Sequence, residues 1–97
     1  MARALYPIAA ILLISAQLAA CSGNPGGAQA SRCSNGLSAA TAELDLAKAE
    51  GFGGTVAWGK AASLLTAARV QYEFEKYPNC IEKVNRARTY IKQSKTG

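Results

Sequence analysis

The N-terminal apolar segment places the strongest limit on what this chain can fold into. Residues 4–16 are apolar apart from Pro7 and Ser15, Arg3 precedes them, and small residues lead from them to Cys21. A basic residue, an apolar run and small residues before a cleavage point are typical of a secretory signal peptide, here residues 1–20. The run is too short and too polar at its end for a membrane-spanning helix, which needs about 20 apolar residues. Removal of the signal leaves residues 21–97, a chain that buries only a small core and usually needs a covalent restraint.

The end of this segment carries a more specific motif. Its residues Leu18-Ala19-Ala20-Cys21 resemble the lipobox of bacterial lipoproteins at all four positions. The resemblance implies that Cys21 receives a diacylglycerol, that the signal is cut before it, and that its new amino group takes a further acyl chain such as palmitate. Several acyl chains anchor a protein stably in a membrane. Among Gram-negative members an Asp after the cysteine favours retention in the inner membrane, so Ser22 favours the outer membrane, with the protein facing the periplasm.

The stretch that follows has the composition of a tether. Residues 22–31 are small and polar, contain Gly and Pro, and show no apolar period. Such sequences behave as flexible linkers. We therefore predict that residues 21–32 are the lipidated cysteine and a linker, and that residues 33–95 form the folded domain.

The remaining cysteines predict a disulfide. If Cys21 carries lipid, Cys33 and Cys80 are the two that remain, and an even pair in an oxidising compartment favours a disulfide. A zinc site is disfavoured, because the chain has no histidine and two thiols cannot supply four ligands. Closing the chain between residues 33 and 80 would stabilise the domain by about 4 kcal/mol.

Three stretches of the domain show apolar residues at the three- and four-residue spacing of an amphipathic helix. They predict helices over about residues 36–50, 56–76 and 79–94 and no strand, so the predicted fold class is all-α. Val70 and Phe74 widen the apolar face of the middle helix, as expected for a helix that contacts two neighbours. The residues predicted to face the core are Leu37, Ala40, Leu44 and Ala47, then Ala57, Ala61, Leu64, Leu65, Ala68 and Tyr72, then Cys80, Val84, Ala87 and Ile91.

Capping and breaking residues set the predicted ends of these helices. Glycines between residues 51 and 54 end the first helix, and Tyr77-Pro78 ends the second. The predicted N-caps are Ser34 or Asn35 for the first helix, Thr55 for the second and Asn79 for the third. Four aromatic residues are expected in the core or at its edge, namely Phe52, Trp58, Tyr72 and Tyr90.

The disulfide and the helix order agree with each other. In an up-down-up three-helix bundle the first and third helices start at the same end, which is where Cys33 and Cys80 lie. Residues 60–90 also resemble one tetratricopeptide-type helix pair, at Leu64, Ala68, Tyr77, Cys80, Val84 and Ala87. That resemblance implies a protein-binding groove and no chemistry, although the chain has no second repeat to extend the stack.

Residue types that catalysis needs are scarce. Without histidine, a serine or threonine nucleophile lacks its usual base, and no pair of carboxylates has a suitable spacing. Residues 54–60 fit the G-x-x-x-x-G-K pattern of a phosphate-binding loop. However, Ala61 replaces the hydroxyl residue that would hold magnesium, and no strand precedes the motif. We therefore expect no enzyme activity, no cofactor and no metal, and a glycine turn that enters the second helix.

The positive charge is concentrated near the C-terminus. Six of the eleven Lys and Arg residues lie in residues 76–97, where Glu82 is the one acidic residue. Either they form a solvated rim around a buried face, or they bind an anion. The candidate anion-binding residues are Lys83, Arg86, Arg88, Lys92 and Lys95.

Taken together, the sequence predicts a non-catalytic lipoprotein of the cell envelope that binds an envelope protein. The alternative is direct binding of anionic envelope material through the basic C-terminal helix, namely lipopolysaccharide, anionic lipid or peptidoglycan. A small inhibitor or accessory subunit of an envelope enzyme also fits. Nucleic acid is excluded as a partner mainly by the compartment.

Overall fold

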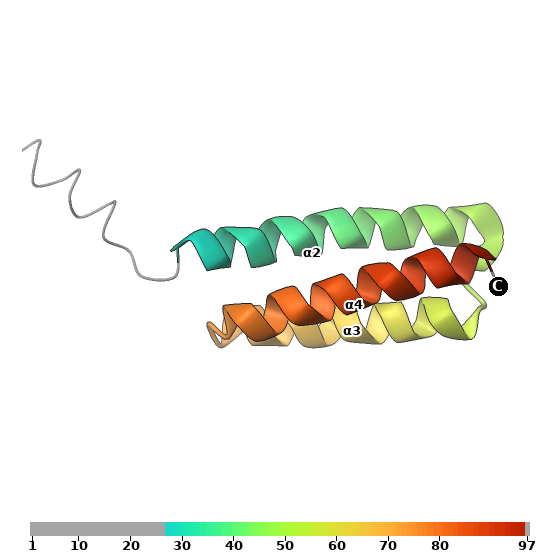
Figure 1. Cartoon of the computed structure of the whole chain (residues 1–97). Coiled ribbons are helices and arrows are strands. Elements are labelled where there is room, and N and C mark those ends of the chain that lie inside the picture. The colour runs from blue at the N-terminus through green and yellow to red at the C-terminus, as the bar shows by residue number, and fades with distance from the viewer. Residues whose placement is uncertain (1–26, 97) are drawn as a thin grey trace, which may run out of the picture.

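The computed structural model describes residues 27–96, which form a three-helix bundle (Figure 1). The helices are α2 (Gly27–Ala47), α3 (Val56–Glu73) and α4 (Tyr77–Thr96), and a short π-helical segment, η2 (Lys48–Phe52), directly follows α2. α2 and α4 run in the same direction and α3 runs against them. The predicted all-α, up-down-up bundle is therefore confirmed. The signal peptide, Cys21 and residues 22–26 lie outside the described residues.

The core is a narrow column of small side chains between the three helices. Five of its twelve apolar residues are alanines, so the helices approach one another closely. Gly36 serves the same purpose, because a Cβ at this position would lie 3.1 Å from Cγ1 of Val84. The buried apolar residues are Cys33, Leu37, Ala40, Leu44 and Ala47 of α2, Ala61, Leu65 and Ala68 of α3, and Cys80, Val84, Ala87 and Ile91 of α4.

The first helix begins earlier than predicted. α2 starts at Gly27 rather than at residue 36, so residues 27–32, which we predicted to be linker, are helical. Ser34 and Asn35, predicted as caps, lie inside the helix. The physical reason is that Cys33 is fully buried and bonded to α4, which holds this part of the chain in place. Residues 28–30, Ala-Gln-Ala, are good helix formers and extend the helix from Cys33 toward the N-terminus.

The connection between α2 and α3 depends on one glycine and one threonine. Gly51 has φ 101°, a left-handed conformation that favours glycine and ends the helical path. Thr55 caps α3 as predicted: its Oγ1 accepts a hydrogen bond from the Trp58 backbone N–H at 3.1 Å. The Trp58 ring is half-buried, and its Nε1–H donates to the carbonyl of Leu44 at 2.9 Å. Backbone conformation and side-chain contacts thus fix the angle between α2 and α3 together.

The connection between α3 and α4 lies earlier in the chain than predicted and is one residue longer. α3 ends at Glu73 rather than at residue 76, and α4 begins at Tyr77 rather than at residue 79. Proline lacks a backbone N–H and is tolerated in the first turn of a helix, so Pro78 begins α4 instead of separating the helices. Asn79 therefore lies within α4 and is not its cap. The chain reverses through residues 74–76, where Glu75 adopts the left-handed region with φ 61°.

The predicted apolar face of α3 is partly wrong. Ala61, Leu65 and Ala68 are buried as predicted, and Leu64 packs at the edge of the core. Val70 and Phe74, in contrast, are exposed at 46% and 71%, and Tyr72 is also exposed. In this bundle both neighbours of α3, α2 and α4, lie on one side of it (Figure 1). Within residues 27–96, no other element packs against its opposite side.

Candidate functional site

The disulfide between Cys33 and Cys80 is confirmed. It joins α2 to α4 with a Cα–Cα distance of 5.7 Å, and both residues are fully buried. Because solvent does not reach the sulfur atoms, the bond restrains the fold and does not present a reactive group. It also holds the second turn of α2 beside the first turn of α4.

The five basic residues predicted to bind an anion do not form one patch. Helical periodicity places Arg88, Lys92 and Lys95 on the side of α4 toward α2, and Lys83 and Arg86 on the side toward α3. The first three lie along an α2–α4 edge and the other two along an α3–α4 edge. The two edges have different electrostatic surroundings.

Carboxylates from α2 and from the adjoining η2 segment partly neutralise the α2–α4 edge. Arg88 donates two hydrogen bonds to the carboxylate of Glu43, at 3.2 Å from Nε and 2.5 Å from Nη2. Lys95 Nζ lies 3.3 Å from Oε1 of Glu50. These pairs are exposed, so each contributes little to stability. The two carboxylates do, however, pair with two of the five basic residues that we predicted to be available for an anion.

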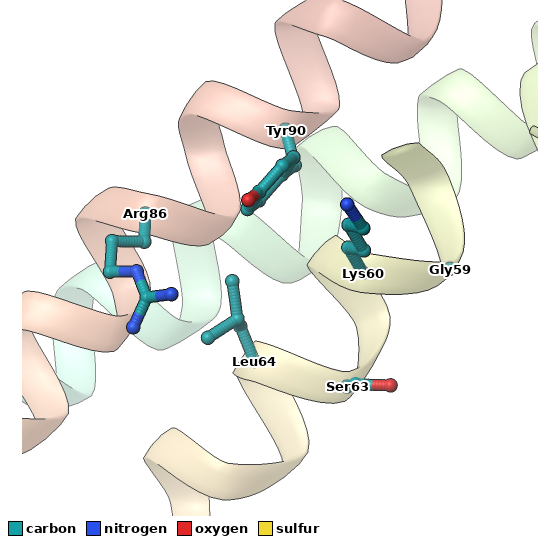
Figure 2. Close-up of a pocket in the computed structure, with 6 residues that line it drawn as sticks. All are labelled: Gly59, Lys60, Ser63, Leu64, Arg86 and Tyr90. Carbon is teal, nitrogen blue, oxygen red and sulfur yellow. The ribbon is translucent and has the colours of Figure 1, made fainter. Parts of the chain in front are cut away.

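The α3–α4 edge contains a shallow, open groove (Figure 2). Leu64 from α3 and Tyr90 from α4 lie between the helices and pack against the edge of the core. Lys60 on α3 and Arg86 on α4 extend toward the same space from opposite walls. The groove therefore combines an apolar floor with cations on both sides. Its lining residues are Gly59, Lys60, Ser63, Leu64, Arg86 and Tyr90.

The cations of this groove have little compensating negative charge. Lys60 Nζ lies 5.4 Å from the centroid of the Tyr90 ring, within the range of a cation–π contact. Arg86 has one ion pair among the described residues, to Glu82 at 3.9 Å, and both side chains are more than half exposed. No Asp or Glu lines the groove. Lys60 was missed by sequence analysis, because residues 54–60 were interpreted only as a turn entering a helix.

A second surface feature adjoins the groove. We call it the α3 outer strip and define it as Val56, Gly59, Ser63, Val70 and Phe74. Helical periodicity places the first four on the side of α3 away from the core, and Phe74 directly follows the helix as its exposed C-cap. The strip carries no charge, and three of its five members are exposed apolar side chains. Gly59 and Ser63 belong to both the strip and the groove. The two features thus form one continuous surface that is basic along one edge and uncharged across α3.

Three further expectations from the sequence concern metal ligands, aromatic residues and the G-x-x-x-x-G-K pattern. Within residues 27–96 no group of three or more His, Cys, Asp or Glu residues is arranged to hold a metal ion. Phe52, Trp58 and Tyr90 lie at the edge of the core as predicted, whereas Tyr72 is exposed and packs against Tyr77, with ring centroids 5.7 Å apart. Lys60, at the end of the G-x-x-x-x-G-K pattern, lies in an α-helix over Tyr90.

The comparisons with known proteins identify no relative. No protein-family model, no curated protein and no solved structure matches the chain. Among the described helices, none is both long enough and apolar enough to cross a membrane.

Proposed function

We propose that this chain is a lipid-anchored, non-catalytic lipoprotein of the cell envelope whose three-helix domain binds another envelope protein. The lipobox-like sequence ending at Cys21 supports the anchoring, and Ser22 supports an outer-membrane position facing the periplasm. The α3 outer strip is the observation that supports a protein partner. Neither its exposure nor its lack of charge is explained by packing within the described residues.

The exposure of this strip is unfavourable for the isolated domain. Val56 and Phe74 are 76% and 71% exposed and lie near opposite ends of α3. Burying a Val or Phe side chain is worth about 1.5–3 kcal/mol relative to leaving it in water. A partner that covers α3 along its length would gain this free energy. Val70 and Phe74 are four residues apart, and exposed apolar side chains grouped in this way commonly mark an interface.

Anchoring is tested by fractionating cells that express the full chain or its Cys21→Ser variant. We expect the full chain to sediment with membranes and to incorporate a labelled fatty acid, and the variant to lose both properties. Ser22→Asp is a second variant, which should move the protein to the inner membrane of a Gram-negative host. If Cys21→Ser leaves the protein acylated and membrane-bound, the lipoprotein proposal is wrong.

Partner binding is tested by affinity purification of the tagged full chain from detergent-solubilised envelopes, washed at low and then at high salt. A discrete protein that stays bound at high salt would indicate an apolar interface, since salt screens ionic contacts. The paired substitution Val70→Ser and Phe74→Ser should abolish this binding. Leu46→Ser is the control, because Leu46 is 56% exposed on α2, away from the strip. Equal recovery with all variants would contradict the role of the strip.

A second candidate function is the binding of anionic envelope material, favoured by the cations of the α3–α4 edge. Lys60, Lys83 and Arg86 lie there with Glu82 as their nearby acid. Arg88 and Lys95, in contrast, pair with carboxylates of α2 and η2. Binding of this kind would disappear in the high-salt wash and would release lipopolysaccharide, anionic lipid or wall fragments. The same purification therefore separates the two functions.

A further inference from the structure

The α3–α4 groove and the α3 outer strip together indicate what kind of partner segment this surface takes. Gly59 lies between them and has no side chain, and the space that a Cβ there would occupy is open. Leu64 and Tyr90 form an apolar floor inside the groove, and Ser63 is a small residue on its α3 wall. A segment lying along α3 would contact the floor and the strip at once.

The charges around the groove favour an acidic segment. Lys60 and Arg86 project from opposite walls, so a ligand between them meets positive charge on both sides (Figure 2). Lys83 lies one turn before Arg86 on the same side of α4 and adds to this charge. Glu82 is weakly paired with Arg86 at 3.9 Å and lies outside the lining of the groove. Opposite charge at the edges of an interface directs which partner binds and in which register.

The backbone of the groove walls favours a helical segment. A peptide bound in extended form usually obtains its backbone hydrogen bonds from the edge of a sheet. Here both walls are α-helices, whose backbone groups are bonded within each helix. A segment that satisfies its own backbone is therefore the better fit, and an amphipathic helix does so while presenting apolar side chains to the floor.

We propose that the α3–α4 groove binds an acidic amphipathic helix of a partner protein, with its apolar stripe on Leu64 and Tyr90 and its carboxylates on Lys60 and Arg86. This inference rests on the proposed function, namely that the domain binds an envelope protein. It specifies the chemistry of that partner. A second copy of this chain does not fit, because a symmetric interface places like patches together and would bring the same cations face to face.

The experiment uses site-specific photo-crosslinking of the full chain in cells. A benzoylphenylalanine replaces Ser63 on the groove wall, Val70 on the outer strip, or Ser38, an exposed residue of α2 used as the control position. We expect a protein adduct from positions 63 and 70 and none from position 38. Mass spectrometry of the position-63 adduct should identify a segment with apolar residues at helical spacing and Asp or Glu on both borders of that stripe.

Charge reversal tests the ionic contacts. The paired substitution Lys60→Glu and Arg86→Glu should reduce the position-63 adduct by about tenfold or more, because it places repulsive charge at both edges. Lys92→Glu is the matched control on the other side of α4 and should leave the yield unchanged. Replacing the bordering carboxylates of the identified segment by lysine should restore the adduct with the reversed groove. Protease resistance and the disulfide in each variant verify that the domain is folded.

The outcomes separate this inference from the function on which it rests. Two results would support a protein partner but contradict an acidic helix as its binding segment. One is an adduct at position 70 whose yield does not change on charge reversal, and the other is a crosslinked segment without carboxylates. Lipid adducts at position 63 would overturn it in favour of a membrane surface. Absence of protein adducts at both positions would overturn the protein-binding function as well.

Discussion

Removing the disulfide is the most demanding test of how this small domain is stabilised. The perturbation is the double substitution Cys33→Ala and Cys80→Ala. Alanine suits both positions, because each cysteine is fully buried in a core that already contains five alanines. The substitution therefore removes the covalent link and introduces no buried polar group.

The expected loss follows from the length of chain that the bond closes. The two cysteines are 47 residues apart in sequence, for which the chain-entropy relation gives about 4 kcal/mol at 25 °C. A domain spanning residues 27–96 has a total unfolding free energy of about 4–10 kcal/mol by the usual per-residue range. The disulfide thus accounts for a large share of the stability, and its removal should lower Tm by roughly 15–30 °C.

The assay is chemical and thermal unfolding followed by circular dichroism, with the oxidised wild type, the reduced wild type and the double variant measured side by side. We expect the reduced wild type and the variant to unfold nearly together, well below the oxidised protein. A difference of less than about 1 kcal/mol between oxidised wild type and variant would refute the reasoning, since it falls far below the entropic figure. Two free thiols in the native protein would refute it directly.

Three further predictions concern single positions, each measured by the same unfolding assay. Gly59→Ala should stabilise the domain by about 0.5–1 kcal/mol, because helical glycine is entropically unfavourable and the added Cβ meets no atom within 4 Å. A lower unfolding free energy would contradict the open surroundings of Gly59. Glu75→Gly should also stabilise, by about 0.5–1 kcal/mol, since the φ of 61° is strained for a side chain. Its control, Glu73→Gly at the end of α3, should not stabilise. Trp58→Phe should reduce stability by about 0.5–1.5 kcal/mol through loss of the hydrogen bond to the Leu44 carbonyl, and an unchanged unfolding free energy would show that this bond does not fix the α2–α3 angle.

Most of the core could be predicted from the sequence, because it depends on local periodicity. Residues three and four apart lie on one face of a helix wherever that helix is placed. The stripes from Leu37 to Ala47 and from Cys80 to Ile91 are therefore buried as predicted. Thr55 is likewise confirmed as a cap, since capping involves atoms only three residues apart.

The surface that we propose for binding could be predicted only in part. Lys83 and Arg86 were identified from composition, but Lys60 comes from a different helix and becomes their neighbour only through the packing of α3 against α4. Arg88 and Lys95 were predicted as available cations, but Arg88 pairs with Glu43 of α2. Lys95 likewise pairs with Glu50 of η2. Such ion pairs join residues about 45 positions apart, so no local pattern shows them.

The all-α class, the disulfide pairing and the buried stripes of α2 and α4 follow from the amino-acid sequence alone. For α3 the sequence gives only the central part of the buried face, Ala61, Leu65 and Ala68. These depend on residue type and on spacing within a single turn or two of helix. Three features follow from the packing of the helices and not from local sequence: α2 begins at Gly27, Val70 and Phe74 face outward, and the cations divide between two edges. Each of these depends on which helices lie beside one another, and a three-helix bundle leaves one side of every helix without a neighbour.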